Sequence, residues 1–249
     1  MKQILLLLIS FPLLAYTPGK WSHLDEYVLK GKKGGPSKEV VKNESGEVIY
    51  TAKYTYDASG RLLREEYFGK NGRPDGKSVF RYKDNQVQSE VLYDWNDNVK
   101  EKKVFHYNAG KLEKIVLYND SQNIELVCNV SSIKNGVVNG AETIWKITED
   151  TEKFVIYPDE KNKQIWKQAI FNNQNQKVGE VVYFFNAQGL LKKRTNIQQG
   201  NERTNDMEYN RDGKLVQYSF HVKQGEEWKL IKTHYLFYET EGRNIELAN

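Results

Sequence analysis

The sequence is poor in cysteine, in proline and in long apolar runs, and each shortage removes a class of protein. A single cysteine, Cys128, excludes a disulfide framework and a cysteine-rich zinc module. Five prolines and 18 glycines among 249 residues exclude collagen-like and proline-rich low-complexity chains. The mean hydropathy of −0.74 excludes a polytopic membrane protein. What remains is a polar chain that is 12% aromatic and long enough to bury a sizeable core.

An excess of charge of one sign is also missing. Lys and Arg total 37 against 33 for Asp and Glu, and the two signs are interspersed along the chain. Nucleic-acid-binding proteins usually gather their cations into a stripe. The largest basic run here, residues 192–194, lies in a strand-like segment, which favours a solvated strand face over a track for phosphates. We therefore expect no nucleic-acid partner.

The first 15 residues have the order of a secretory signal peptide. A basic start at Lys2 is followed by an apolar run from Ile4 to Leu14 and by a small residue, Ala15. We expect cleavage after residues 1–15, with residues 16–39 forming an N-terminal linker or extension. Because no cysteine lies near the cut, the mature chain is predicted to be periplasmic or secreted and not lipid-anchored. The alternative is a buried N-terminal strand or an uncleaved anchor.

Beyond residue 40 an aromatic doublet with one spacer recurs, and a polar turn that starts with Asp or Asn and ends with Gly follows most copies. The doublets are Tyr54/Tyr56, Phe80/Tyr82, Phe105/Tyr107, Tyr183/Phe185 and Tyr235/Phe237. The turns are 57–60, 108–110, 186–189, 210–213 and 239–242, with an earlier copy at 43–46. A regular spacing of roughly 25 residues predicts a repeat architecture.

The repeat unit is interpreted as a β-hairpin. Asp or Asn at the turn start caps its own backbone, and Gly at the turn end adopts the left-handed conformation. Rings spaced by two project from the same face of a strand, so the doublets predict a half-buried antiparallel sheet with one wet face. We expect Gly60, Gly189 and Gly213 to have positive φ and the doublet rings to form the core. The turns at 94–98 and 172–176 are interpreted as turns of another kind.

The pattern predicts an all-β fold of repeated antiparallel β-hairpins over residues 40–249, with little helix after the leader. The hairpins would form a meander, a curled single sheet or a β-solenoid-like stack, and a small propeller stays open as an alternative. A transmembrane barrel is rejected because cations lie inside predicted strands, and the chain is expected not to be an integral membrane protein. These cations are Lys102, Lys192, Arg194, Lys229 and Lys232.

The first and last hairpins, near Val48 and Ile245, would leave two sheet edges without partners. Unpaired edges recruit strands from other chains unless charges blunt them. Lys38, Lys42 and Arg243 are candidates for such blunting charges. We therefore expect self-assembly or a protein partner.

The segment Tyr56–Leu62, with the sequence Tyr-Asp-Ala-Ser-Gly-Arg-Leu, resembles the YD-repeat (RHS-type) pattern of bacterial exported proteins. Looser copies occur at 107–112 and 209–215. A second resemblance is to MORN-like repeats, where an Asn-Gly turn leads to a second Gly and an aromatic strand, as at 71–82 and 135–145. Both resemblances imply an exported β-repeat scaffold, and neither implies a catalytic residue.

Side chains that suggest chemistry are few. The histidines are scattered without metal-ligand spacing and are interpreted as surface residues; they are His23, His106, His221 and His234. Cys128 is interpreted as a small buried hydrophobe. Asp94 and Asp97 lack the closing Glu of a calcium loop, which favours a solvated turn.

The candidate binding residues are two tryptophans, Trp95 in a predicted turn and Trp228 beside one. An exposed Trp is a common anchor in the recognition of proteins or sugars. For Trp95 the competing interpretation is a ring folded over the edge of the sheet.

The sequence therefore predicts an exported, non-catalytic β-repeat protein that acts as a protein-binding or structural component of the bacterial cell envelope. A protein partner or self-assembly is expected, with a glycan as a further candidate ligand. No catalytic residue, cofactor or metal ligand is assigned. Two alternatives stay open: a carbohydrate-binding module that uses exposed rings, and a glycan-active hydrolase whose acid pair the sequence does not locate.

Overall fold

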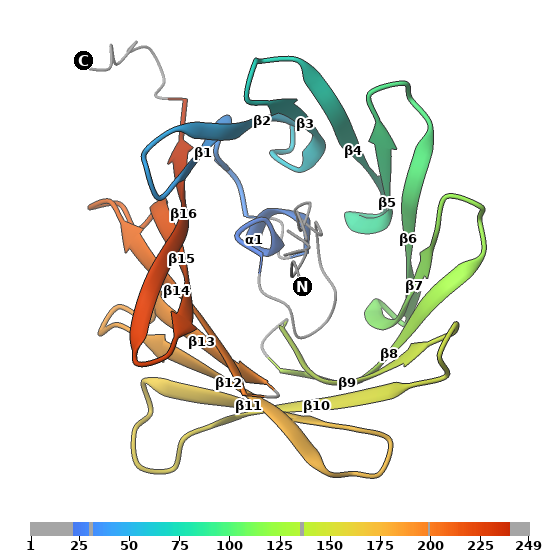
Figure 1. Cartoon of the computed structure of the whole chain (residues 1–249). Helices are drawn as coiled ribbons and strands as arrows, with labels where there is room; N and C mark the ends of the chain where they lie inside the picture. Colours follow the sequence, from blue (N-terminus) through green and yellow to red (C-terminus); the bar gives the residue numbers. More distant parts are fainter. Residues whose placement is uncertain (1–21, 30–31, 135–136, 199, 240–249) are drawn as a thin grey trace, which may run out of the picture.

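A computed structural model describes residues 22–29, 32–134, 137–198 and 200–239. Within these residues the chain forms one short helix, α1 (Asp25–Val28), and sixteen β-strands, each antiparallel to its neighbours. The strands pair in the order of the sequence, and the last pairs with the first, so the sheet closes into a barrel with α1 inside it (Figure 1). Among the described residues, none belongs to a helix long and apolar enough to cross a membrane.

The strands are β1 (Lys38–Asn43), β2 (Val48–Tyr56), β3 (Leu62–Gly69), β4 (Pro74–Lys83), β5 (Gln86–Asp94), β6 (Val99–Asn108), β7 (Lys111–Tyr118), β8 (Ile124–Lys134), β9 (Val137–Trp145), β10 (Thr151–Pro158), β11 (Ile165–Phe171), β12 (Lys177–Phe185), β13 (Leu191–Gln198), β14 (Asn201–Tyr209), β15 (Leu215–Gln224) and β16 (Glu227–Phe237). The all-β fold of antiparallel hairpins is thus confirmed. Its assembly is corrected: the hairpins form neither an open meander nor a solenoid, because β1 and β16 pair along the whole length of β1.

The closure removes the free edges that the sequence suggested. Val48 begins β2, which pairs with β1 on one side and β3 on the other, while Ile245 and Arg243 lie outside the described residues. Lys38 and Lys42 do not blunt an edge.

Both lysines instead cover the seam between β1 and β16. The ammonium group of Lys38 lies 6.0 Å from the ring centroid of Phe237, and that of Lys42 lies 5.5 Å from the ring centroid of Tyr235. These cation–π contacts join the first strand to the last.

The predicted domain boundaries differ from the observed elements at two places. β1 begins at Lys38, two residues before the predicted start of the repeat domain, and α1 lies inside the barrel although its residues belong to the predicted linker at 16–39. The predicted leader, residues 1–15, lies outside the described residues.

One turn geometry recurs at both ends of the barrel. The Oδ1 atom of Asp57 accepts the backbone N–H groups of Ser59 and Arg61, each at 2.9 Å. The same pair of bonds forms at Asn43, Asp94, Asn119, Asn172, Asn186 and Asn210. The turns at 94–98 and 172–176 are therefore of the same kind as the others, not of another kind.

The residue with positive φ explains why those turns were misread. Gly60, Gly189 and Gly213 have φ of 81°, 76° and 73°, as predicted. Asp97 and Asn175 occupy the same position with φ of 66° and 58°. Asn and Asp tolerate the left-handed region better than other residues with a Cβ, so the turn forms there without Gly.

A tyrosine hydroxyl ties each of several hairpins to the one before it. Tyr82 donates to the backbone oxygen of Leu62 at 2.9 Å, and the Arg61 guanidinium lies 5.1 Å from the Tyr82 ring centroid. The same hydroxyl bond joins Tyr209 to Leu191 and Tyr238 to Leu215. The basic and aliphatic residues after the turn glycine therefore bind the turn-leading tyrosine of the next repeat.

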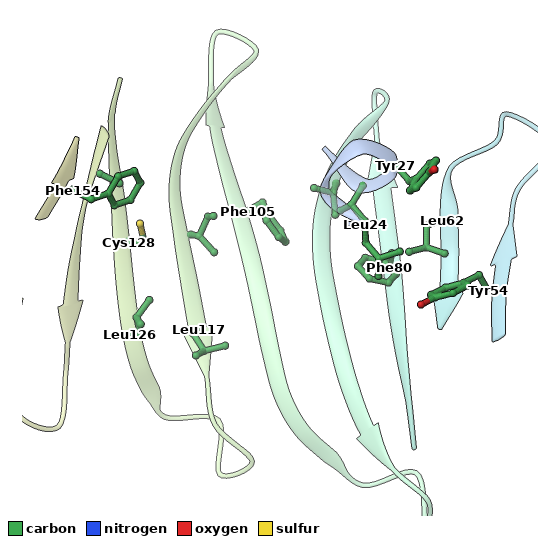
Figure 2. Packing of buried hydrophobic residues seen from close by; sticks show 14 of the residues in the cluster. Leu24, Tyr27, Tyr54, Leu62, Phe80, Phe105, Leu117, Leu126, Cys128 and Phe154 are labelled. Atoms are coloured by element: carbon green, nitrogen blue, oxygen red, sulfur yellow. The ribbon is translucent and has the colours of Figure 1, made fainter. Parts of the chain in front are cut away.

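The rings of the first four doublets form the core inside the barrel, as predicted, whereas Tyr235 and Phe237 of the fifth lie on the other face of the sheet, at the seam. Tyr54, Phe80 and Phe105 are buried, with exposed fractions of 6%, 2% and 2% (Figure 2). The remaining predicted rings pack against the two buried clusters; they are Tyr56, Tyr82, Tyr107, Tyr183 and Phe185. Burial of apolar area at this scale is the main favourable contribution to folding.

Candidate functional site

A row of polar side chains crosses the interior of the barrel on adjacent strands. Tyr54 on β2 stands opposite Glu65 on β3, which stands opposite Ser78 on β4. Further along, Glu90 on β5 stands opposite Lys103 on β6. On the other side the row continues through Glu39 on β1 and His234 on β16; of these seven side chains, Tyr54 is the most exposed, at 6%.

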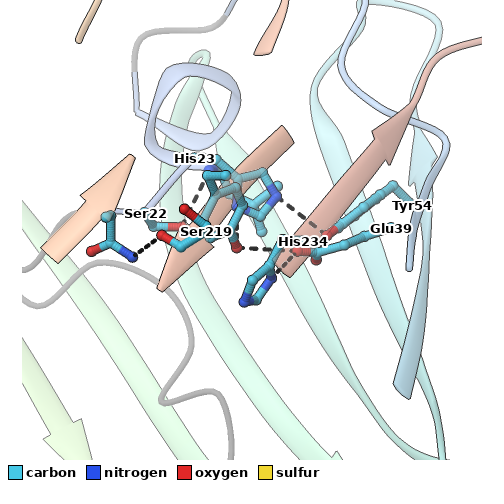
Figure 3. A network of polar contacts seen from close by, with 9 residues as sticks. Ser22, His23, Glu39, Tyr54, Ser219 and His234 are labelled. Carbon is cyan, nitrogen blue, oxygen red and sulfur yellow. Dashed lines mark hydrogen bonds and ion pairs between the residues drawn. The ribbon is translucent and has the colours of Figure 1, made fainter. Parts of the chain in front are cut away.

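Glu39 is the centre of one half of this row, which it forms with Tyr54 and His234 (Figure 3). Its Oε1 accepts hydrogen bonds from Nδ1 of His234 at 2.5 Å and from the hydroxyl of Tyr218 at 3.1 Å. Its Oε2 accepts the hydroxyl of Tyr54 at 2.5 Å. A buried carboxylate with three donors is satisfied on both oxygens.

The donors set the charge of Glu39. Burial alone would raise the pKa of Glu39, but His23, His234 and the Tyr54 hydroxyl outweigh burial and hold this pKa at about 2. Burial lowers the pKa of His234 more than Glu39 raises it, and burial also lowers the pKa of His23. At neutral pH the centre is therefore a carboxylate that faces neutral imidazoles and protonated tyrosines.

His23 connects the segment that carries α1 to this centre. Its Nε2 lies 3.3 Å from the hydroxyl of Tyr54, and its Nδ1 lies 3.5 Å from the hydroxyl of Tyr218. Leu24, which follows His23, and Val28 within α1 are buried against the wall, with exposed fractions of 1% and 5%. The segment is thus held by polar contacts on one side and by apolar packing on the other.

The other half of the row consists of Glu65, Ser78, Glu90 and Lys103, and its polar atoms have fewer hydrogen-bond partners. Burial raises the pKa of Glu65 to about 8 and that of Glu90 to about 7. Lys103 lies 3.4 Å from Glu90 and 3.2 Å from Glu101. Among the described residues, Oε2 of Glu65 has no hydrogen-bond partner. Glu65 is therefore held mostly protonated at neutral pH.

A cavity of about 450 Å³ adjoins the half of the row that contains Glu39, and we call it the α1 cavity. On one side it is lined by the α1 segment, including His23, Asp25 and Tyr27, and on the other by the ends of the hairpins from β12 to β16. The wall contributes aromatic rings and aliphatic side chains, among them Tyr183, Phe185, Leu190, Tyr209 and Tyr238.

The hydroxyls of the wall rings are already used. Tyr209 and Tyr238 donate to backbone oxygens, and Tyr183 donates to Oε1 of Gln168 at 2.6 Å. The rings therefore offer mainly apolar surface to the α1 cavity, while the polar side chains that line it, including His23, Asp25 and Lys32, come from the segment around α1. This arrangement suits a small molecule with an apolar body and a polar end.

The sequence-predicted residues lie elsewhere. Trp95 is 69% exposed in the turn between β5 and β6, and Trp228 is 40% exposed near the start of β16. Their binding role stays a prediction. Cys128 is buried, as expected. Within the described residues, no three His, Cys, Asp or Glu side chains are grouped so that they could hold a metal ion.

Two histidines contradict their interpretation as surface residues. His234 is 4% exposed, and both His234 and His23 contact the network around Glu39. Sequence spacing gave no sign of this, because the two residues come from opposite ends of the chain. For Glu65 the strand period was a usable signal, because Glu65 lies two residues before Tyr67 on β3 and therefore on the same face of the strand.

Comparison with known proteins shows the fold and nothing more specific. No family model and no curated protein matches the chain. A porin-like protein from Bacteroides uniformis is similar in structure, with a TM-score of 0.55 and 11% identity over 84% of this chain and 98% of that one. A porin-like protein from Bacteroides vulgatus covers 82% and 98% of the two chains at 10% identity, with a TM-score of 0.38.

These findings correct two predictions. The resemblances to YD and MORN-like repeats are not confirmed, and only the repeated antiparallel strands stand. The prediction that the chain is not an integral membrane protein is wrong, because the strands close into the barrel architecture shared with the porin-like protein.

The basis of that prediction also fails for two of its five cations, Arg194 and Lys232, whereas Lys192 and Lys229 are exposed. It took cations within strands to lie on the outer face. Arg194 faces the interior, where its guanidinium lies 5.8 Å from the Tyr183 ring centroid. Lys232 is two residues from His234 on β16 and is close enough to Glu39 for the carboxylate to oppose the lowering of its pKa by burial.

Proposed function

We propose that this chain is a non-catalytic binding protein of the bacterial cell envelope that takes a small molecule with an apolar body and a polar end into the α1 cavity. The observation that carries the proposal is the composition of this cavity. Its volume of about 450 Å³ lies in the range of small-molecule sites, and its polar groups gather on one side.

The state of Glu39 supports a non-catalytic role. A general acid or base must reach the reacting group of a substrate. Glu39 is 2% exposed, and its oxygens are taken by His234, Tyr54 and Tyr218. It therefore supports the shape of the site and does not contact a ligand.

The closed seam favours binding inside the barrel over binding at an edge. The sequence suggested that a partner would add a strand to a free edge. Since β1 and β16 occupy each other's edges, that mode is not open to either strand. The α1 cavity remains as a concave surface with mixed chemistry.

A blocking variant tests the α1 cavity. N-phenyl-1-naphthylamine, an apolar fluorophore with one amine, serves as the probe, and its fluorescence is titrated with protein. We expect saturable binding to the wild type and loss of binding in Leu190→Trp, because Leu190 lines the cavity and is only half-buried. Leu63→Trp, at an outward position with 36% exposure, should bind as the wild type does.

Probe binding by the two variants is compared after thermal melts have shown that both are equally stable. Equal binding by both variants, or no saturable binding by the wild type, would contradict the role of the α1 cavity. Turnover of any member of a glycan panel would contradict the non-catalytic part and favour the hydrolase alternative.

The cell-envelope address rests on the leader pattern of residues 1–15. Intact mass of natively produced protein should lack these residues, and fractionation should recover the chain from the envelope or the medium. A cytoplasmic species that retains Met1 would contradict export. Recovery from the outer membrane fraction, compared with the soluble periplasm, tells which compartment of the envelope holds the barrel.

The exposed tryptophans favour a second candidate function, the protein-binding or structural role predicted from the sequence. Trp95 and Trp228 are large apolar side chains with 69% and 40% exposure, and both stand at the end of the barrel opposite the α1 cavity. Cross-linking in the native envelope should capture a partner, and Trp95→Ser should reduce its yield. Unchanged cross-linking would remove this candidate.

A further inference from the structure

A second cavity lies at the other end of the barrel, and we call it the Trp145 cavity. β12 runs from Val178 at this cavity to Phe185 at the α1 cavity, and β13 runs back from Leu191 to Gln198. The two cavities are therefore separated by about the length of one strand. The volume of the Trp145 cavity is about 480 Å³.

The two cavities differ in chemistry. Apart from Val178, the Trp145 cavity is lined by one indole ring and by hydroxyl, amide and carboxyl groups. The polar lining residues are Thr148, Asp150, Thr151, Glu152, Asn172, Asn173 and Gln198. The α1 cavity, by contrast, is lined mainly by rings and aliphatic side chains.

Trp145 is fixed by packing against the core and by a backbone hydrogen bond. It is half-buried and packs against the hydrophobic core, while its backbone N–H donates to the backbone oxygen of Asp150 at 2.9 Å. The indole offers an apolar face and a single N–H donor. Such a ring anchors a ligand at little cost in conformational entropy.

Glu152 and Gln198 are brought together across the inner face of the sheet. The Nε2 atom of Gln198 on β13 donates to Oε2 of Glu152 on β10 at 3.3 Å, although β11 and β12 lie between the two strands. Gly179 leaves room for Gln198 here, since a Cβ at that position would lie 3.1 Å from Cγ of Gln198 and would force a small shift. A primary amide has two donors and an acceptor, so the contact leaves Gln198 with capacity for a ligand.

The charges of the lining select the ligand class. Two carboxyl groups, of Asp150 and Glu152, line the cavity together with three primary amides, of which that of Asn172 is used within its own turn, and no lysine or arginine is among the described residues that line it. An anionic ligand would meet like charge and no counter-charge. A neutral molecule with several hydroxyls and one apolar face matches the acceptors, the amides and the indole ring together.

We infer that the Trp145 cavity is a second binding site, distinct from the α1 cavity, and that its ligand is a neutral saccharide. The apolar face of a pyranose ring packs on Trp145, and the ring hydroxyls bind Glu152, Gln198 and Asp150. The cavity volume lies in the range of small-molecule sites. The site does not depend on the α1 cavity, because the two share no lining residue within the part of the chain that the structure describes.

Isothermal titration calorimetry tests this inference with glucose, galactose, mannose, xylose, N-acetylglucosamine, maltose and cellobiose. At least one should bind with one-to-one stoichiometry. Gln198→Ala and Glu152→Gln should each weaken that binding about tenfold, the loss expected when one hydrogen bond between the protein and the sugar is removed. Trp145→Phe should weaken it as well, and thermal melts identify any variant that loses its fold.

Matched controls test whether substitutions outside the Trp145 cavity affect sugar binding. Trp95→Phe and Trp228→Phe remove indole rings at the same end of the barrel without touching the cavity and should leave affinity unchanged. Leu190→Trp, which blocks the α1 cavity, should also leave it unchanged, so the failure of one site is distinguishable from the failure of the other.

Three results would overturn the inference. One is a folded wild type that binds none of the seven sugars. Another is sugar binding that Glu152→Gln and Gln198→Ala do not change. The third is binding of a cationic amine, such as glucosamine, in place of every neutral sugar, because it would assign the carboxyl groups to an ion pair.

Discussion

At the scale of single residues, Glu39 is a buried charge that its neighbours satisfy from three directions. The amide of Glu39→Gln has nearly the same volume, but it would place an N–H group against the hydroxyl or imidazole donors that now face the carboxylate. We expect this substitution to lower the free energy of unfolding by about 3–5 kcal/mol, the usual cost of disrupting one member of a buried polar pair. Urea denaturation measures the change.

Tyr54→Phe is the matched control for Glu39→Gln. It removes one of the three donors to Glu39 and leaves the ring in place, so the expected cost is smaller, about 1.5–3 kcal/mol. If Glu39→Gln cost less than Tyr54→Phe, the carboxylate would not be the centre of the network.

Glu65 makes a separate prediction about pH. Its folded pKa of about 8 lies above the ordinary glutamate value of 4.5, so the folded state keeps a proton that the unfolded state has released. Stability therefore falls as pH rises between these two values. The wild type should lose about 1.5 kcal/mol relative to Glu65→Gln between pH 6.5 and 8.

The comparison of the two proteins isolates this carboxyl from other groups that titrate in the same range. His23 and His234 have lowered pKa values and lose stability in the opposite direction, as pH falls below 6.5. Both proteins share that effect. Parallel stability curves for the wild type and Glu65→Gln above pH 6.5 would show that Glu65 is ionised in the folded state.

The network around Glu39 could not be predicted from the sequence, for a physical reason. Its members come from β1, β2, β15, β16 and the segment before α1, and they meet only because the barrel closes. Glu65 was more accessible to prediction, because strand periodicity places it on the same face of β3 as Tyr67, two residues along.

At the scale of elements, the repeated turn was predictable wherever it ends in glycine. The Asp or Asn cap and the left-handed glycine are local features, and Gly60, Gly189 and Gly213 have the expected φ. Copies with Asp97 or Asn175 at the same position escaped recognition. The helix α1 also escaped, because four residues are too few to show a helical period.

Gly189→Val tests the energetic role of the turn conformation. A Cβ at Gly189 meets no atom within 4 Å, so its cost comes from the backbone alone, with φ at 76°. We expect a loss of about 1–2 kcal/mol in the free energy of unfolding. Gly69→Val is the control, because Gly69 ends β3, is not among the positive-φ glycines, and a Cβ there meets only a backbone oxygen at 4.0 Å.

Equal destabilisation by the two variants would indicate that side-chain size, and not the left-handed conformation, decides the cost. Chemical denaturation at one temperature suffices for the comparison. Far-ultraviolet circular dichroism verifies that both variants keep the sheet.

At the scale of the whole molecule, closure is the step that sequence reasoning could not take. The hairpin pattern predicts strands that pair antiparallel with their neighbours in the chain, and the structure confirms this mode of pairing. The pairing of β1 with β16 joins residues near the two ends of the chain, so no local signal reports it. Closure also satisfies the backbone groups of both terminal strands, which an open sheet would leave exposed.

A pair of cysteines across the seam tests closure directly. Val40 on β1 and Tyr235 on β16 are partners in the register, and neither side chain points toward Glu39 and His234 inside the barrel. Directly opposed residues of antiparallel strands lie about 4.5–5.5 Å apart between Cα atoms, within the range of a disulfide. We expect Val40→Cys with Tyr235→Cys to form an intramolecular disulfide on mild oxidation, visible as a faster band on a non-reducing gel.

The native thiol does not interfere with this measurement. Cys128 is buried, and burial raises its pKa to about 11, which suppresses the reactive thiolate. Val40→Cys paired with Val104→Cys on β6 is the control and should stay reduced or form only dimers, since four strands separate β1 from β6. If the seam pair also gave only intermolecular dimers, β1 and β16 would be free edges, and strand addition would return as the mode of partner binding.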